Sequence, residues 1–577
     1  MSARRRGPAW PRGWLPWLPK SLLCLPEYSA ATLTADAIAG VTVGLVALPL
    51  AMAFAISSGL SPQAGIYCAI VTGFTISALG GSRCQVGGPT GAFVVVIAGI
   101  VAKYGVDGLF MCTMMAGAIL IAFGLGGLGA AVRFIPRPVV VGFTNGIAVL
   151  IASTQVGDFL GLRIAEVPGD FVGRLRTLGA HLSTWSPATA ALGVGALALI
   201  VAFQRRRARV PGTIVALLLG TLVAAVLGLP VDTIGSRFGG IPMGLPSVHV
   251  PAFRSDLVLL LIPSAITVAL LGAIESLLSA VVSDRMTGDR HNPNVELMAQ
   301  GVANLLSPLF GGLPATGAIA RTATNVRSGA RTPVAGMIHA FTLVAVLLVA
   351  APLAQFIPLC VLAAILFVVA YNMSEWHEVP DLFQLTKTDV SVWFVTFALT
   401  VFADLTLAIE VGIVLAALLY IRRVADTTSI ERVTTEYVEA GRAHILQDKQ
   451  IPPYVGILRI HGPFLFGSTD KLQPILDGLE TLPSIVILRL RNMTALDGTG
   501  LLAIEEFGDC LRASGRQMLL CGARRQPAEL LAKAGLVRVG GADNVLPDVH
   551  AALARARTLH EREPAAAAAV AGSLSLH

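Results

Sequence analysis

The sequence predicts a polytopic α-helical membrane protein with fourteen transmembrane segments and a small α/β domain at its C-terminus. Of its 577 residues, 54% are hydrophobic and only 13% are charged, roughly half the charged fraction of a soluble protein. The hydrophobic residues gather in blocks, and crossing a bilayer takes about 20 helical residues. Near residue 430 these blocks give way to short strand-like segments.

The apolar blocks define the membrane part of the chain. Two of them, 91–102 and 317–327, are too short to span a bilayer alone. We place the fourteen blocks near 37–57, 64–80, 91–102, 107–129, 138–156, 187–204, 212–229, 257–283, 296–310, 317–327, 334–355, 358–372, 389–404 and 407–422.

Loop charges predict the orientation of these segments. Arg4–Arg6 precede the first block, and the basic clusters follow even-numbered blocks, among them the run at 205–209 and the pair Arg422 and Arg423. Positive charges gather on the cytoplasmic side, so both termini are predicted to be cytoplasmic. This placement accounts for the net charge of +7 without nucleic acid as a partner. No signal peptide is predicted, because no apolar core with a cleavage site follows the basic N-terminus.

The chain beyond residue 430 has the pattern of one small α/β domain. Strand-like segments lie at 454–460, 484–490 and 517–523, and helical stretches lie near 469–480, 499–514 and 526–535. Such alternation is typical of an α/β domain. The alanine-rich end after Pro564 has no core to join, so we expect it to be disordered. The predicted boundaries are 1–35 for an N-terminal segment, 36–425 for the membrane domain, 430–558 for the α/β domain and 559–577 for the tail.

The sequence offers no catalytic or metal-binding cluster. Its seven cysteines are scattered, with no CxxC pair and no histidine at ligand spacing, which argues against a disulfide framework and a metal site. No Ser/His/Asp grouping or phosphate-binding loop is found either. We therefore expect neither an enzyme nor a bound cofactor.

The two short blocks begin alike. "GGPTGAFVVV" (87–96) and "GGLPATGAIART" (311–322) each start with a glycine pair and a proline, and each lies third in its set of seven blocks. Interrupted segments at matching places in two halves of a chain point to a transporter site near the bilayer midplane. Helix N-termini that meet there would aim unpaired N–H groups at one point, which suits an anion. Glycine and proline are common in membrane helices, but the matched pair favours a site.

Glu275 lies deep in the eighth block, within "LLGAIESLLSAVVSD" (270–284). Ser264, Thr267 and Ser279 fall near the same helical face. An ionisable group at this depth costs at least ~2–3 kcal/mol and usually faces a cavity or a partner. Because burial disfavours the charged form, Glu275 is a candidate proton carrier. The alternative is a hydrogen bond to another helix that serves packing alone.

Arg321 lies just inside the second short block. Its fixed charge and forked donors match a carboxylate or a sulfate. The alternatives are a salt bridge to Glu275 or an arginine in an intracellular cavity. These interpretations overlap, since an arginine paired with Glu275 in the empty protein could release it when an anion arrives.

At these residues the sequence resembles the SulP sulfate-permease family, the bacterial relatives of the prestin and pendrin anion transporters. The likeness covers nearly the whole chain. It rests on "DAIAGVTVGLVALPLAMAFAISSGLSPQAGIY" (36–67), "GGPTGAFVVV", "PRPVVVGFTNGIAVLIASTQVGDFLG" (136–161) and "NVELMAQGVANLLSPLFGGLPATGAIARTATNVRSGARTP" (294–333). Within the family, "LLGAIESLLSAVV", "MTG", "ATGAIART" and "YNMSEWHEV" are most similar to the proton-coupled C4-dicarboxylate transporters of enteric bacteria.

The resemblance implies two inverted seven-helix repeats, about 36–230 and 256–425, divided into a core and a gate domain that move in an elevator-like way. It also implies a homodimer in a bacterial inner membrane. The anion pocket would lie between the third and tenth helices, and binding would need Arg321. The residues implied to line it are Phe54, Thr90, Gly91, Ala92, Phe93, Thr316, Gly317, Ala318, Ile319 and Ala320.

The resemblance also bears on coupling and regulation. Glu275 matches a position where sodium-driven bicarbonate members have an aspartate, and those members lack an arginine matching Arg321, which implies proton coupling. The tail resembles a STAS domain through its loop "LDGTG" (496–500). In this loop, Thr499 falls at the position that is phosphorylated in some soluble relatives. Gly498, between Asp497 and Thr499, departs from the pattern of the family. A regulatory role of this loop, and a cytoplasmic partner for it, are hypotheses beside a scaffold role.

The leading prediction is secondary active uptake of a C4-dicarboxylate (succinate, fumarate or aspartate) together with a proton. One alternative is a sulfate or bicarbonate transporter or exchanger of the same architecture. Another is a passive anion channel in which Glu275 is structural. A third is a membrane-anchored signalling protein whose output is the STAS domain.

Overall fold

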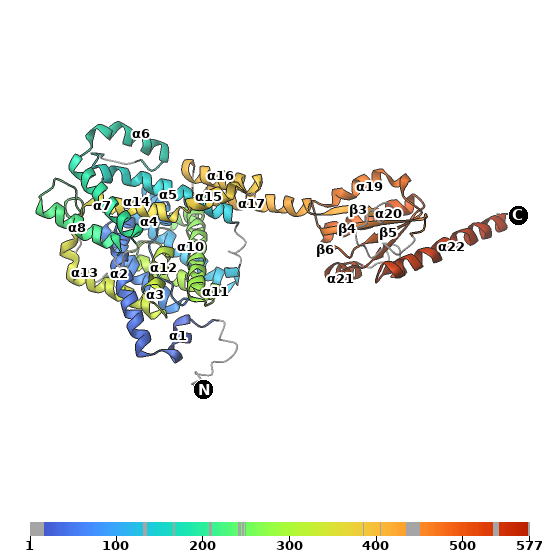
Figure 1. Ribbon diagram of the computed structural model, residues 1–577, viewed down its shortest axis with the longest axis horizontal. Helices are drawn as coiled ribbons and strands as arrows, with labels where there is room; N and C mark the ends of the chain where they lie inside the picture. The colour runs from blue at the N-terminus through green and yellow to red at the C-terminus, as the bar shows by residue number, and fades with distance from the viewer. Residues whose placement is uncertain are drawn as a thin grey trace. The chain divides into compact units, whose positions relative to one another are not determined.

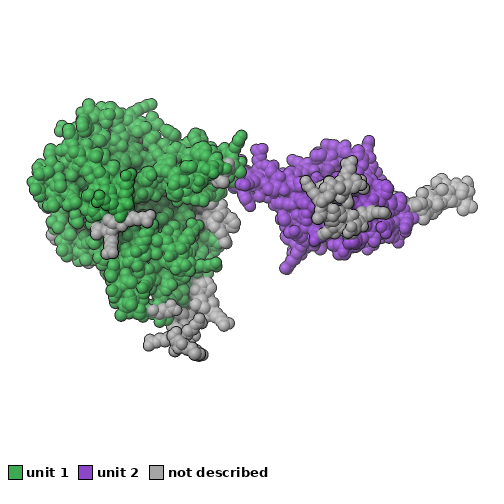
Figure 2. Space-filling model, viewed as in Figure 1, with its two compact units in different colours: residues 1–416 green, residues 417–577 purple. Residues whose placement is uncertain are grey.

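The computed structural model forms two compact units, Met1–Ala416 and Ala417–His577 (Figure 2). It describes residues 17–130, 136–164, 168–206, 211–240, 244, 247–248, 250–384, 386–403, 405–433, 451–534 and 542–574. Of the basic clusters used to predict orientation, Arg4–Arg6 and residues 207–209 lie outside these ranges. Each unit is described by itself below.

The first unit is built of helices, and each of the fourteen apolar blocks corresponds to one of them (Figure 1). In the described part of the chain, eight helices are long and apolar enough to cross a membrane, and α8 is a shorter apolar helix. The helices that match the blocks are α2 (Ala30–Ser57), α3 (Pro62–Leu79), α4 (Gly91–Leu125), α5 (Arg137–Leu160), α7 (Pro187–Arg205), α8 (Gly212–Val226), α10 (Val258–Thr287), α11 (Pro293–Leu306), α12 (Ile319–Arg327), α13 (Val334–Ala354), α14 (Leu359–Met373), α16 (Lys387–Phe402) and α17 (Leu405–Asp426).

The third and fourth blocks form one continuous element, α4, with a break inside it. Gly105 has φ +74° and ψ −176°, a conformation that only glycine adopts readily. The two sides of this break correspond to the predicted blocks 91–102 and 107–129. The glycine therefore explains why the sequence showed two apolar blocks within one 35-residue element.

Helix packing in the first unit repeats between its two halves. α10 packs against α4 as α2 packs against α13, and α11 packs against α4 as α3 packs against α13. In the same way, α5 packs against α16 and α14 packs against α7. This pairing is the pattern expected of two related seven-helix repeats. Short helices connect the longer ones: α1 (Lys20–Cys24), α6 (Phe171–His181), α9 (Ile234–Phe238) and α15 (Val379–Phe383).

Two very short strands join the halves at the centre of this unit. β1 (Gly87–Gly88) pairs antiparallel with β2 (Thr316–Gly317), so that Gly87 lies opposite Gly317. β1 precedes α4 and β2 precedes α12. Because the strands are antiparallel, the two helices begin close together and leave in opposite directions.

The second unit is an α/β domain around one sheet of strand order β3-β4-β5-β7-β8, with β6 paired to β4. The strands β4, β5 and β7 pair in parallel, and β3 pairs antiparallel with β4. Hydrophobic clusters cover both faces of the sheet. The elements are β3 (Ser429–Val433), β4 (Val455–Phe464), α19 (Gln473–Asp477), β5 (Ile485–Arg489), β6 (Met493–Leu496), α20 (Gly498–Ala513), β7 (Gln517–Cys521), α21 (Arg525–Lys533), β8 (Val545–Leu546) and α22 (Val549–Leu574).

The three predicted strands correspond to β4, β5 and β7. β3, β6 and β8 were not predicted, because they are two to five residues long and carry no sustained alternation. The structure also differs at the C-terminus, where α22 continues to Leu574 instead of giving way to a disordered tail. Alanine has the highest helix propensity of all residues, so an alanine-rich segment can extend a helix that starts on the domain.

Candidate functional site

The two short segments singled out in the sequence meet in the structure. Beyond the β1–β2 pairing, the N–H of Ala318 donates to the carbonyl oxygen of Val86 at 2.9 Å. Thr90 and Ala318 are the N-cap residues of α4 and α12. The first N–H groups of each helix have no intrahelical acceptor, and the positive ends of both helix dipoles therefore lie near the same point.

Buried polar side chains hold these loops against α10. The hydroxyl of Thr316 donates to the carbonyl oxygen of Gly272 at 2.9 Å, and the hydroxyl of Thr322 accepts from the N–H of Val86 at 3.1 Å. The carboxylate of Glu296 accepts from the N–H groups of Gly81 and Ser82 at 2.9 and 3.2 Å. These hydrogen bonds tie the loops before α4 and α12 to the helices around them.

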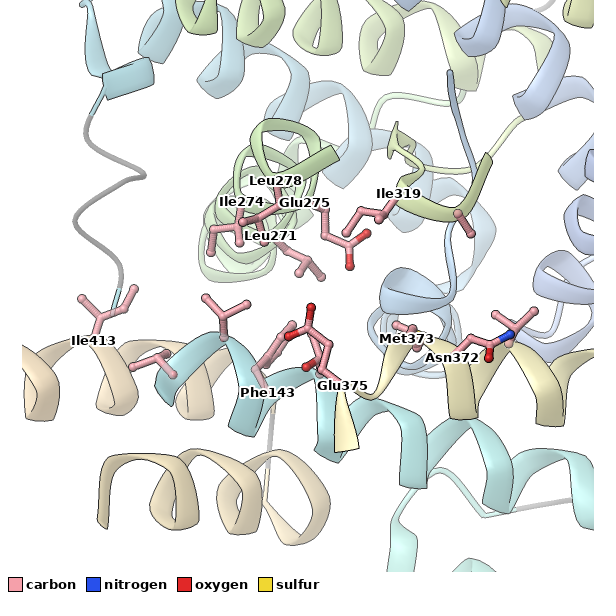
Figure 3. A pocket seen from close by; sticks show the side chains of 15 residues that line it. Phe143, Leu271, Ile274, Glu275, Leu278, Ile319, Asn372, Met373, Glu375 and Ile413 are labelled. Carbon is pink, nitrogen blue, oxygen red and sulfur yellow. The ribbon is translucent and has the colours of Figure 1, made fainter. Parts of the chain in front are cut away.

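A cavity of about 240 Å³ lies beside the N-terminus of α12. Figure 3 shows its wall, formed by α10, the first turns of α5, the end of α14, α12 and α17. The lining is mostly apolar. Its residues are Val139, Val140, Phe143, Thr144, Leu271, Ile274, Glu275, Leu278, Ile319, Ala320, Val369, Asn372, Met373, Glu375 and Ile413.

Glu275 faces this cavity from the middle of α10, and its side chain is 9% exposed. It lies beside Thr90, whose hydroxyl is buried and has no hydrogen-bond partner of ordinary geometry among the described residues. No ion pair to Glu275 is found in the described part of the chain. The carboxyl group of Glu275 thus lies in mostly apolar surroundings in the wall of the cavity.

Arg321 is placed differently from what we expected. Its side chain is 2% exposed and does not line the cavity. Its Nη1 donates to the carbonyl oxygen of Gly87 at 3.5 Å, and its Nη2 donates to that of Pro89. Within the described residues it forms no ion pair with Glu275. The guanidinium group therefore braces the loop before α4 and adds a buried positive charge behind the two helix N-termini.

The other implied pocket residues divide into three sets. Ile319 and Ala320 line the cavity together with Glu275. The ring of Phe54 lies against Gly91, where an added Cβ would meet it at 3.3 Å. The remaining residues are buried around the β1–β2 pair and do not line the cavity: Thr90, Gly91, Ala92, Phe93, Thr316, Gly317 and Ala318.

Glu375 is a cavity residue that the sequence reasoning missed. It follows α14, has φ +47°, and is the one non-glycine residue of the described chain with positive φ. Such a conformation costs of order 1–3 kcal/mol and is often found at functional sites. In Figure 3 its carboxyl group points toward that of Glu275. The motif "YNMSEWHEV" contained the signal, but Glu375 falls after the twelfth apolar block and so did not stand out by depth.

In the second unit, the loop around Asp497 is a helix cap. Asp497 is the N-cap of α20, and its carboxylate accepts from the N–H groups of Gly500 at 2.8 Å and Phe466 at 3.0 Å. Thr499 lies in the first turn of the helix and is exposed. These contacts explain the aspartate structurally, and the regulatory role of this loop stays a hypothesis.

The fold and this site define a class: an α-helical membrane transporter with a C-terminal STAS domain. The sequence model of the Sulfate permease family matches residues 33–396, and that of the STAS domain matches residues 447–552. The chain therefore belongs to the sulfate permease family, whose members are anion transporters and not enzymes. The domain limits that we predicted stay predictions, because the matched ranges do not test them.

Two curated relatives cover most of the chain. "Putative sulfate transporter YvdB" of Bacillus subtilis is 41% identical over 88% of this chain and 95% of its own length. "Bicarbonate transporter BicA" of Picosynechococcus is 31% identical over 87% of this chain and 91% of its own length. One of these relatives is therefore named for sulfate and the other for bicarbonate.

Solved structures support the fold. The transmembrane domain of a cyanobacterial BicA matches 68% of this chain and 98% of its own, with a TM-score of 0.60 and 34% identity. The structure of SLC26A9 matches 96% of this chain and 94% of its own, with a TM-score of 0.84 and 17% identity. The second likeness extends over both units and concerns the fold alone.

Proposed function

We propose that this protein is a secondary active transporter that carries C4-dicarboxylates inward together with protons. The observation that carries the proposal is the place of Glu275: a buried carboxyl group in the wall of a cavity that also contains the N-terminus of α12. An anion entering this cavity is attracted by the helix N-terminus and repelled by an ionised Glu275. Protonation of Glu275 removes the repulsion, so anion and proton are best bound together.

The mechanism that this arrangement supports is elevator-like alternating access. Glu275, the α12 N-terminus and the paired strands β1 and β2 form one connected block through α10. The opposite wall comes from α5, the end of α14 and α17. In the proposed cycle, the connected block around Glu275 is the core, and the helices of the opposite wall are the gate. The core slides along the gate and carries the anion across the membrane. The proposal includes a homodimer in a bacterial inner membrane. Both termini of each chain would lie on the cytoplasmic side.

The choice of C4-dicarboxylate rests on the resemblance of "LLGAIESLLSAVV" and "ATGAIART" to transporters of that class. The relatives named for sulfate and bicarbonate make those anions the alternative cargo. A passive channel is the alternative mode. It would carry anion current with no coupled movement of protons.

Uptake into proteoliposomes tests both parts. Labelled succinate is offered with and without an inward proton gradient, and separately with a sodium gradient, while unlabelled sulfate and bicarbonate serve as competitors. We expect accumulation that requires the proton gradient. Proton-driven uptake of labelled sulfate or bicarbonate in parallel assays, without succinate uptake, would overturn the cargo but keep the coupling. Large anion currents without a change of internal pH would overturn the coupling.

A further inference from the structure

A second cavity, of about 470 Å³, opens at the other end of α5. Residues from Val139 to Thr144 of α5 line the cavity that contains Glu275, whereas Ser153 to Asp158 line this one. At 1.5 Å per residue, Val140 and Gln155 lie about 22 Å apart along the helix. The two cavities share no lining residue, so this is a separate space on the opposite side of the first unit.

Arg174 of α6 lies in the wall of this second cavity and is 4% exposed. Its Nη1 donates to the hydroxyl of Ser153 at 3.0 Å, and its Nη2 donates to the carbonyl oxygen of Gly169 at 2.8 Å. Its Nε is buried without a hydrogen-bond partner. The two contacts use two of the five N–H donors of the guanidinium group, so donors remain for an acceptor.

Arg174 interacts electrostatically with the carboxylate of Asp170, the N-cap residue of α6. Within the described residues it forms no ion pair. The other charged residues in the wall are Arg237 and Asp158, which pair with one another at 2.5 Å. The described wall thus contains two arginines and one carboxylate, a net charge of +1. Burial of the Arg174 charge is unfavourable, and a bound anion would add to the compensation that Asp170 provides.

One wall of this cavity is formed by the first part of α4, which lies next to the candidate transport site. Val94, Val95 and Ala98 of α4 line it, and they follow directly on the first turn of α4, which adjoins Glu275 through Thr90. An anion bound near Arg174 would therefore be separated from the Glu275 cavity by the start of α4. With cytoplasmic termini, the second cavity would face the outside of the cell.

We propose that the second cavity is an entry site for small oxyanions, in which Arg174 is the fixed cation that attracts and orients them. Guanidinium groups match the planar pair of oxygens of a carboxylate and two oxygens of a sulfate. The proposal rests on the chain being an anion transporter and not on which anion it carries. The two residues would then have different roles. Arg174 concentrates anions at the entry, and Glu275 couples their transfer to protons.

The test measures charge selectivity in the cavity without requiring transport. In full-length purified protein carrying Cys510→Ser, Ala98→Cys provides one thiol in the wall. Its rates of modification by anionic and cationic methanethiosulfonates of similar size are compared. We expect the anionic reagent to be favoured, and Arg174→Gln to lower the anionic-to-cationic ratio about tenfold, the effect of one unit charge a few ångströms away in partly shielded surroundings.

Two variants provide controls. Arg176 lies on the same helix and is exposed, so Arg176→Gln should leave the ratio unchanged. Arg174→Lys keeps the charge and should keep most of the selectivity, even if Arg174→Gln disturbs the packing of α6. Inorganic sulfate should slow the modification of Ala98→Cys in the parent protein and have no effect in Arg174→Gln. Equal ratios for the Gln variants at 174 and 176, or a parent protein without anionic preference, would overturn the proposal, whatever the outcome of succinate uptake.

Discussion

The carboxyl groups of Glu275 and Glu375 face one another across the cavity, one from α10 and the other from the turn after α14 (Figure 3). In the proposed cycle these elements belong to the core and the gate respectively. We expect two ionised carboxylates in apolar surroundings to repel one another. In that proposed cycle, the pair would couple the relative position of core and gate to proton binding.

Removing the carboxyl group of Glu275 should separate transport from the proton gradient. We expect Glu275→Gln to lower gradient-driven accumulation at least about tenfold, which corresponds to ~1.4 kcal/mol of lost coupling, because a glutamine cannot bind or release the proton. Exchange of labelled for unlabelled anion should survive, since the α12 N-terminus is unchanged. Glu275→Asp keeps the carboxyl group and serves as the control. Undiminished gradient-driven accumulation by the glutamine variant would exclude Glu275 as the coupling residue.

Replacing Glu375 should shift the pH dependence of uptake without abolishing uptake. In Glu375→Gln the negative charge opposite Glu275 is gone, and an ionised Glu275 is repelled less. The pH at which uptake is half-maximal should therefore fall. Initial rates measured from pH 5 to 8 check this. Asp381, an exposed carboxylate of α15, gives the matched control Asp381→Asn, whose profile should coincide with that of the parent protein.

Arg321 should be sensitive to conservative replacement, because it braces carbonyl groups that are buried with it. Arg321→Lys loses the fork that reaches both Gly87 and Pro89, and a lysine is a poor substitute at such a site. We expect anion affinity to fall in both Arg321→Lys and Arg321→Ala, with the larger loss in the alanine variant. Binding of labelled anion to the purified protein measures this. An affinity of Arg321→Ala equal to the parent's would contradict the bracing role.

A substitution at Gly88 provides an independent test of the role of Arg321. It has φ +145°, and a Cβ at this position would lie 2.4 Å from Nη1 of Arg321. Gly88→Ala should therefore both strain the backbone and displace the guanidinium group. Anion affinity should fall as in Arg321→Lys although every charge is retained. Gly99→Ala is the control, because an added Cβ meets no atom within 4 Å there.

Sequence patterns predicted the helices and the meeting of the two interrupted segments, and both came from features that are local along the chain. The depth of Glu275 in its apolar block was sufficient to select it. The role of Arg321 could not be read in this way, because its partners are backbone carbonyls 232 and 234 residues earlier in the chain. Glu375 was missed because the strained turn that carries it into the cavity leaves no periodic pattern.

The cysteines of the protein should differ sharply in reactivity. Cys510 on α20 is exposed, and the other six are buried. In the STAS domain, burial raises the pKa of Cys521 to about 12, so almost no reactive thiolate forms there at pH 8. A maleimide should label one thiol per chain in the folded protein, and Cys510→Ser should abolish that labelling. Mass spectrometry of labelled peptides identifies the site. Rapid labelling of Cys521 in the native state would show that the sheet opens.

Acid should destabilise the STAS domain through His461 of β4. Burial and the neighbouring charge of Arg459 lower the pKa of His461, whereas an unfolded histidine titrates near 6.5. The folded domain therefore binds this proton less readily than the unfolded chain, and its stability is full above about pH 6.5 and declines as the pH falls below that value. Denaturant unfolding of the fragment 417–577 at pH 7.5 and 5.5 measures the loss. Between pH 7.5 and pH 5.5, the fragment carrying His461→Gln should lose less free energy of unfolding than the parent fragment. A parent fragment and a His461→Gln variant that respond equally to acid would show that other groups carry the dependence.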